Sequence, residues 1–200
     1  MVQEILQPKM ELGGVNAAAV MMGGVHHAIM GLSQMLGQEI RVTGTKYEKI
    51  LVKDIADLFG GPETIIVGVY LAISGSVFGH MLVAYKPQIA FDLVDILLEK
   101  PPNSTTELLE METSVLGEVG NIMGSFFLNH IADGTGTTLH PSPPAVMMDM
   151  AGSILDAALA NILAQADYAY VVKTSFGTGD RHLSGTFLVL PALSGSPTAS

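Results

Sequence analysis

The sequence has no cysteine and few charged residues. The 200-residue chain therefore has no disulfide or thiol chemistry, and a reducing compartment is permitted. Charged residues make up only 14%, with nine Lys and Arg against 19 Asp and Glu, for a net charge of -10. This balance argues against nucleic acid and anionic membrane surfaces as partners. Hydrophobic residues make up 48%, which excludes a disordered chain and suffices for a real core.

Targeting and membrane-spanning segments are also missing. The first fourteen residues, MVQEILQPKMELGG, have no basic region followed by an apolar one, so we expect no signal peptide. The most apolar long stretch, residues 13–37, contains polar residues such as Asn16, His26 and His27, which makes it a poor membrane span. We therefore expect a cytoplasmic protein with no membrane insertion.

The order of predicted elements is the same in the two halves of the chain. Long helices are predicted over residues 13–36 and 105–132, the second with a capping box formed by Ser104 and Glu107. Each long helix is followed by two short strand candidates, which in the first half lie within residues 39–54 around a glycine-containing turn. A helical segment and a β-hairpin then follow in each half, and a helix over residues 87–100 ends the first half. This order indicates an internal repeat.

The repeat leads to a prediction of the fold class. The second strands of the two hairpins, FGHMLVAY and SGTFLVLP, keep Gly, Leu and Val in register. We expect one α+β domain over residues 1–200, with a first repeat at about 13–99 and a second at about 104–192. It should be a pseudo-two-fold tandem repeat with a mostly antiparallel sheet and the two long helices packed on one face.

A narrow polar stripe lies on the second long helix. At 100° per residue, Ser114, Glu118 and Asn121 share one side, beside a strip of three glycines. Three interior glycines cost about 3 kcal/mol relative to alanine. Either close packing against the sheet or another helix, or the approach of a partner's backbone, would explain them. Taken alone, the Glu and Asn are better explained as a solvated helix face.

The spacing of four residues carries a family resemblance. Ser114 is followed after three residues by Glu118, after two more by Asn121, and after twenty-two more by Pro144. This pattern, with the local sequence LGEVGNIMGSFFLN, resembles the signature of the CheC/CheX/FliY family of chemotaxis phosphatases, which act on the response regulator CheY. The alternation of elements over almost the whole chain is also similar to that family.

The first half departs from the family pattern. The segment GLSQMLGQEI resembles the end of a first signature helix. Counting back from it, the glutamate position falls on Ala19, the asparagine position on Met22 and the proline position on Thr45. All three signature residues are therefore replaced. We expect a degenerate first site that keeps its packing role, and one intact site in the second half.

The resemblance implies a role for each residue of the intact site. It identifies Asn121 and Glu118 as catalytic: Asn121 would orient the attacking water, and Glu118 would form a salt bridge to the active-site lysine of the receiver domain. Ser114 would support the start of the stripe and Pro144 would fix the adjacent loop. The implied partner is a phosphorylated CheY-type receiver protein, which brings its own Mg²⁺. No metal or cofactor is expected in this chain, since the adjacent His26 and His27 face apart on a helix.

A different class of function is the alternative. The same scaffold could be a non-enzymatic binding module that binds a CheD-type receptor deamidase or forms part of a flagellar switch. Replacement of the first site shows that the scaffold can persist without catalytic residues. The intact pair of Glu118 and Asn121 favours the phosphatase.

Overall fold

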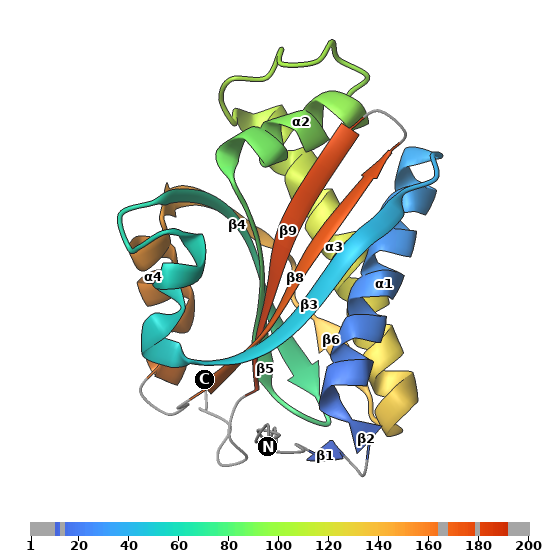
Figure 1. Cartoon of the computed structure of the whole chain (residues 1–200), viewed down its shortest axis with the longest axis vertical. Helices are drawn as coiled ribbons and strands as arrows, with labels where there is room; N and C mark the ends of the chain where they lie inside the picture. Colours follow the sequence, from blue (N-terminus) through green and yellow to red (C-terminus); the bar gives the residue numbers. More distant parts are fainter. Residues whose placement is uncertain (1–10, 13–14, 164–167, 179–180, 192–200) are drawn as a thin grey trace, which may run out of the picture.

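A seven-stranded antiparallel sheet forms the centre of the protein (Figure 1). The computed structural model describes residues 11–12, 15–163, 168–178 and 181–191. The strands of this sheet are β3 Arg41–Leu51, β4 Ile65–Gly75, β5 Gly79–Tyr85, β6 Leu139–Pro141, β7 Ala145–Met150, β8 Tyr168–Thr178 and β9 Arg181–Pro191. Their order is β3-β8-β9-β5-β4, and both β6 and β7 pair with the outer edge of β4.

Helices cover both faces of this sheet. The long helices α1 Ala17–Leu36 and α3 Glu110–Thr135 lie side by side on one face, and α2 Pro87–Leu97 packs at one end of the same core (Figure 1). The other face carries α4 Ala151–Leu163 and two 3₁₀ turns, η1 Val52–Asp54 and η2 Ala56–Phe59. Two short strands, β1 Glu11–Leu12 and β2 Val15–Asn16, pair antiparallel before α1. Among the described helices, none is long and apolar enough to cross a membrane.

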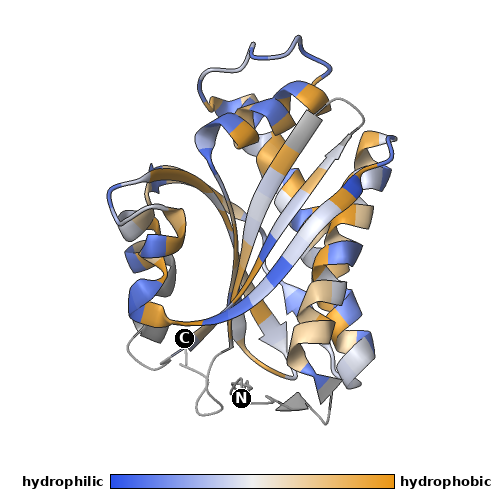
Figure 2. Ribbon diagram, in the orientation of Figure 1, coloured by the Kyte–Doolittle hydropathy of each residue, from blue (hydrophilic) through white to orange (hydrophobic). Residues whose placement is uncertain are grey.

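Alternating side chains of the strands build a core on each face. In β5, Met81 and Val83 pack under the long helices, whereas Leu82 and Ala84 pack under α4. Because successive strand residues point to opposite faces, strands buried on both sides must be apolar nearly throughout. Figure 2 shows the complementary pattern in α2, where hydrophobic and hydrophilic residues alternate around the helix. Both cores contain residues from both halves. The predicted fold class, α+β with an antiparallel sheet and the two long helices packed on one face, is confirmed.

The strand registers reveal the pseudo-two-fold axis. In the pairing of β5 with β9, Leu82 lies directly opposite Leu188, and these are the leucines aligned by the sequence repeat. The axis therefore passes between them. The flanking pairs are images of each other, Met81 with Val189 and Val83 with Phe187.

The packing of the two long helices follows the same symmetry. Gly31 of α1 lies against Ile122, and Gly23 lies against His130. If Met22 is taken as the counterpart of Asn121, Gly31 corresponds to His130 and Gly23 to Ile122. The two-fold axis then converts each of these contacts into the other. The ring contact between His27 and His130 is likewise the image of the contact between Gly31 and Phe126. Helix packing therefore supports the alignment that places Ala19 and Met22 at the signature positions of the first half.

One strand prediction was wrong. Residues 39–54 were expected to form two short strands around a turn at Gly44, but β3 is one continuous strand of eleven residues. The register with β8 shifts between Val42 and Gly44, and the pairing then continues to Leu51. A β-bulge accommodates the glycine without reversing the chain, because it inserts one extra residue and bends the strand.

The glycine strip of α3 lies against β4. A Cβ atom at Gly120 would overlap Cγ1 of Val69, and one at Gly124 would lie 3.0 Å from Cδ2 of Leu71. Both β4 side chains are fully buried. Close packing against the sheet therefore explains these two glycines. The short separation between α3 and β4 depends on them.

We expect Gly120→Ala to lower the free energy of unfolding by about 1–3 kcal/mol, because the added methyl group overpacks the contact with Val69. The matched control is Gly134→Ala in the same helix, where nothing lies within 4 Å of the added atom. Alanine there should be neutral or stabilising by up to about 1 kcal/mol. Urea unfolding of both variants measures the difference, and equal stabilities would contradict the packing account.

Candidate functional site

The four predicted site residues line one open groove on the surface. Ser114, Glu118 and Asn121 are exposed on α3, and Pro144 lies across the groove in the loop between β6 and β7. Residues three and four apart on a helix are neighbours on its surface, so the polar side chains form one continuous row. The structure thus brings together residues that are up to thirty positions apart in the sequence.

The loop opposite the helix is held to the sheet by Ser142. Its backbone N–H donates to the carbonyl of Ala72 at 2.8 Å, and its hydroxyl accepts from the Ala72 N–H at 2.9 Å. The same hydroxyl donates to the carbonyl of Pro143 at 2.9 Å. These bonds, together with the fixed φ angles of the prolines, give the groove a rigid wall. Pro144 owes its position to this anchor on β4.

Gly117 keeps the groove open between the helix and the loop. A Cβ atom there would lie 3.8 Å from both Cγ of Pro144 and Cγ2 of Val146, which is ordinary van der Waals contact. Packing therefore does not demand a glycine at this position, in contrast to Gly120. The alternative explanation from the sequence, access for a partner, applies to Gly117 alone.

The two signature side chains are free to meet a partner. Among the described residues, neither Glu118 nor Asn121 has a side-chain hydrogen bond or ion pair. An exposed carboxylate and an exposed amide therefore stand one turn apart with their hydrogen-bonding capacity directed outward. This arrangement suits polar recognition of a second molecule.

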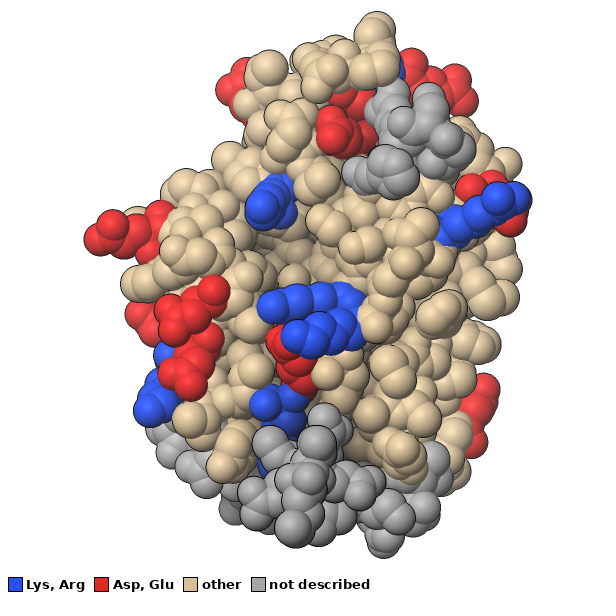
Figure 3. Space-filling view, in the orientation of Figure 1, with Lys and Arg blue, Asp and Glu red and all other residues tan. Residues whose placement is uncertain are grey.

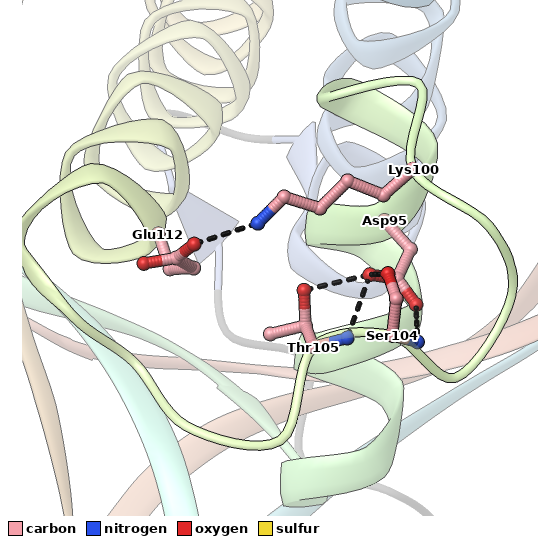
Figure 4. Close-up of polar contacts among 5 residues, drawn as sticks. All are labelled: Asp95, Lys100, Ser104, Thr105 and Glu112. Carbon is pink, nitrogen blue, oxygen red and sulfur yellow. Dashed lines mark hydrogen bonds and ion pairs between the residues drawn. The ribbon is translucent and has the colours of Figure 1, made fainter.

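A buried carboxylate fixes the chain just before α3 (Figure 4). Asp95 of α2 is fully buried and accepts hydrogen bonds from the backbone N–H and hydroxyl of Ser104, at 3.0 and 2.9 Å, and from those of Thr105, at 3.0 and 2.6 Å. Burial acts to raise the pKa of Asp95, but the bonds from Thr105 and Ser104 outweigh it and hold the pKa below its usual value.

An ion pair ties the first turn of α3 to the segment that follows α2. Lys100 Nζ lies 2.7 Å from Oε1 of Glu112, which is largely buried (Figure 4). The hydrogen bond from Lys100 holds the pKa of Glu112 below its usual value. Glu112 precedes Ser114 by two residues, so this contact and the Asp95 cluster fix the N-terminal end of the polar stripe.

The predicted capping box at the start of α3 was wrong. The helix begins at Glu110, and its N-cap residue, Leu109, has no side-chain cap. Ser104 instead donates to Asp95, a residue of the preceding helix. A local capping signal was thus overridden by a buried carboxylate that needs donors, and Glu107 lies outside the helix.

Two features of the site were not predicted. Pro141, Ser142 and Pro143 line the groove together with Pro144, and the sequence PSPP was a usable signal for a rigid wall. Met111 is also exposed, at 62%, and it lies three residues before Ser114 on the same side of α3. Helical periodicity alone could have placed this apolar side chain at the end of the stripe.

The first half lacks this arrangement. Through the two-fold axis, the sheet registers place Val146 of β7 and Lys49 of β3 at equivalent positions. The counterpart of Pro144 is therefore Tyr47, whereas counting along the sequence had given Thr45. The ring of Tyr47 stacks on a tyrosine of β8. A large aromatic side chain thus occupies the position where the second half has the wall of its groove.

The comparisons with known proteins point to the same segment of the chain. The model of the CheC-like family matches residues 111–148, the segment that contains the polar stripe and Pro144. The CheY-P phosphatase CheC of Bacillus subtilis (strain 168) is 28% identical over 154 residues, which is 76% of this chain and 74% of that protein. The chain is therefore similar to the CheC-like family in this segment, and to a CheC phosphatase over most of its length.

Solved structures show how far the CheC-like fold extends. FliY of Thermotoga maritima has a TM-score of 0.69 at 19% identity, covering 92% of this chain and 91% of that one. CheX, in a complex with CheY, BeF3 and Mg²⁺ from Borrelia burgdorferi, has a TM-score of 0.54 at 18% identity, covering 85% of this chain and 96% of that one. At these identities the likeness is one of fold.

The Asp95 cluster predicts a pH-dependent contribution to the stability of this protein. Asp95→Asn should cost about 1–3 kcal/mol near neutral pH, because an amide NH₂ would face the donor of Ser104 or Thr105. The folded-state pKa is depressed, so the contribution is present above the unfolded pKa, about 4, and is lost as pH falls through the lower folded value.

Urea unfolding at a series of pH values measures this difference. The difference in the free energy of unfolding between wild type and Asp95→Asn should become smaller as the pH falls. The control Asp92→Asn, at the surface of the same helix, should have nearly the stability of wild type at every pH. A gap that is constant with pH would contradict the assignment of Asp95 as a charged acceptor.

Proposed function

We propose that this protein is a phosphatase that hydrolyses the aspartyl phosphate of a CheY-type response regulator in chemotaxis signalling. The observation that carries this proposal is the exposed, unpaired couple of Glu118 and Asn121 beside the Pro144 loop. It lies within the segment matched by the CheC-like family. The CheY-P phosphatase activity named for the Bacillus subtilis relative supports it.

Asn121 is the residue that acts on water in this proposal. Phosphoryl transfer requires little covalent help from the protein, but it requires a nucleophile held in line with the leaving oxygen. A side-chain amide both donates and accepts hydrogen bonds, so it can orient a water toward phosphorus without accepting its proton. Asn121 is exposed and has no competing partner among the described residues.

Glu118 docks the partner in this proposal. Its carboxylate would pair with the active-site lysine of the receiver and thereby align Asn121 with the phosphoryl group. Because this carboxylate has no cation partner among the described residues, docking would not require an existing ion pair to break. Ser114 and Pro144 support the two ends of the groove, and neither needs to touch phosphate.

The metal requirement belongs to the partner in this proposal. In the part of the chain that the structure describes, no three His, Asp or Glu side chains come together as a metal site. The receiver would bring Mg²⁺, and this chain would bring no cofactor. The receiver would also place the phosphatase in the cytoplasm. The CheX complex with CheY and Mg²⁺ supports binding of a CheY-type partner by a protein of this fold.

A non-enzymatic binding module is the second candidate. The presence of Ala19 and Met22 at the first-half signature positions, within symmetric helix packing, supports a scaffold role that needs no site residues. A CheD-type deamidase or a flagellar switch component would be the partner in that case. The difference lies in catalysis: a binding module has no effect on the lifetime of the phosphorylated receiver.

Variants of the two signature residues should separate docking from chemistry. Asn121→Ala should retain stability and affinity for the phosphorylated receiver, yet lower kcat by about 100-fold or more, the scale of removing one positioned donor from a transition state. Glu118→Ala and the isosteric Glu118→Gln should both raise KM, by about tenfold, because an ion pair is lost. The assay follows phosphate loss from a Mg²⁺-loaded, pre-phosphorylated receiver.

The control for this assay is Gln34→Ala, an exposed change on α1 that should leave both constants unchanged. If wild type accelerates dephosphorylation of no receiver from its own organism, the binding-module function replaces the phosphatase. If Asn121→Ala is fully active, the assignment of the water-orienting residue is wrong.

Substitution of Met22 tests whether the first half contributes only packing. The half-buried side chain of Met22 packs against the core, so Met22→Ala should lower the free energy of unfolding by about 1–2 kcal/mol, roughly half the cost for a fully buried methionine. The activity per folded molecule should be unchanged. Thermal unfolding and the same phosphatase assay measure the two effects, and a large loss of activity at intact fold would show that α1 contributes to a site.

A further inference from the structure

A second hollow lies on the opposite face of the sheet from α1 and α3. It is bounded by η2 on one side and by the start of α2 at one end, with β8 and β9 as its floor. Figure 3 shows it as a recess near the centre of the molecule. Its volume of about 540 Å³ lies within the size range of small-molecule sites, roughly 300–1,000 Å³.

Basic side chains gather at this hollow, although the chain as a whole is strongly acidic. Lys86 and Lys173 line it, and Figure 3 shows basic side chains, drawn in blue, beside the recess. Lys173 lies 3.5 Å from Glu48, which also contacts Lys46. Lys86 has no ion pair among the described residues.

Hydroxyl groups form the floor between the lysines. In the ladder of β8 with β9, Lys173 lies opposite Thr186 and Ser175 lies opposite Ser184. Directly opposed side chains on one face of a sheet are about 5 Å apart. The ammonium of Lys173 and the three hydroxyls of this floor therefore form a compact array of hydrogen-bond donors. Lys86, directly after β5, adds a second positive charge.

The helix α2, which begins at the hollow, adds to the positive electrostatic potential there. Lys86 is the N-cap residue of α2, and the first turn of that helix contains no acidic residue. The N-terminal end of a helix carries a partial positive charge, which favours an anion nearby. One carboxylate, that of the exposed Asp57, also lines the hollow, so the lining lysines outnumber the lining acids.

The remaining wall is apolar. Leu58 and Phe59 of η2 face the hollow together with Ile66 and Ala84 from the sheet. Ile66 and Ala84 belong to the second hydrophobic core, against which Leu58 and Phe59 are packed. The hollow thus offers donors and positive charge at one side and a fixed apolar surface at the other, the combination typical of sites for small organic molecules.

We propose that this hollow binds a small organic anion, with its phosphate or carboxylate head on Lys86, Lys173 and the hydroxyl floor, and its apolar body against Phe59. This site is separate from the Glu118 and Asn121 groove, which lies on the α3 side of the sheet. It does not depend on the phosphatase activity.

The test uses small molecules that carry the anionic head group and the apolar body of the proposed ligand either together or separately. Phenyl phosphate and benzoate carry the two candidate heads on one apolar ring, while inorganic phosphate and phenol supply the head or the ring alone. Titrations followed by backbone amide NMR should show shifts at residues 173–175 and 184–186 with phenyl phosphate, benzoate or both, at millimolar concentration. Inorganic phosphate and phenol should bind more weakly, and the better of the two complete probes identifies the head group.

Charge variants test the basic rim. Lys86→Gln, at an exposed position, should weaken binding of the better probe by about tenfold, the scale of one hydrogen bond to a charged group. Lys53→Gln removes the same charge from η1 outside the hollow and should leave affinity unchanged. Thr186→Val tests the floor without altering charge and should also weaken binding.

Three results would overturn the proposal. The first is that neither phenyl phosphate nor benzoate shifts the backbone amide signals of the floor strands. The second is that phenol binds as tightly as phenyl phosphate and benzoate do. The third is an equal loss of affinity in Lys53→Gln and Lys86→Gln, which would show that only overall charge matters.

Discussion

The close approach of α3 to β4 is the contact on which the site depends. Gly120 and Gly124 remove the side chains that would hold the helix away from Val69 and Leu71. This contact fixes the rotation of α3 about its axis, because no other face of the helix could lie so near the sheet. The stripe of Ser114, Glu118 and Asn121 is then left exposed beside the Pro144 loop, which is itself anchored on the same strand. One strand thus sets both sides of the groove.

The two halves show that packing and chemistry are separable in this fold. Gly23 and Gly31 of α1 take part in symmetric contacts with α3, so the helix pair needs small residues at these positions. Ala19 is exposed at the position equivalent to Glu118, and the core makes no demand on it. Signature residues can therefore be replaced in one half at little cost in stability, whereas the glycines of the helix interface cannot.

The helices and the polar stripe could be predicted from local periodicity, and the fold class could be predicted from the repeated order of the elements. The same reasoning failed where a distant residue decides the local structure. Ser104 had the pattern of a helix cap, but the buried carboxylate of Asp95 takes its hydroxyl. The basic hollow also escaped prediction, because its lining comes from segments far apart in the chain and no single segment carries a motif. Counting along the sequence also gave the wrong first-half counterpart of Pro144, because only the strand registers of the structure identify Tyr47 at that position.

The central claim is that a CheY-type receiver docks on the α3 stripe and on that stripe alone. Because the chain has no cysteine, a single introduced cysteine can carry a photo-crosslinker at one known position. Ser114→Cys places it at the end of the stripe, and Ala19→Cys places it at an exposed site of α1, equivalent to Glu118 through the two-fold axis. The account predicts crosslinking to the phosphorylated receiver from position 114 and little from position 19. Equal crosslinking from both positions, or crosslinking from position 19 alone, would contradict it.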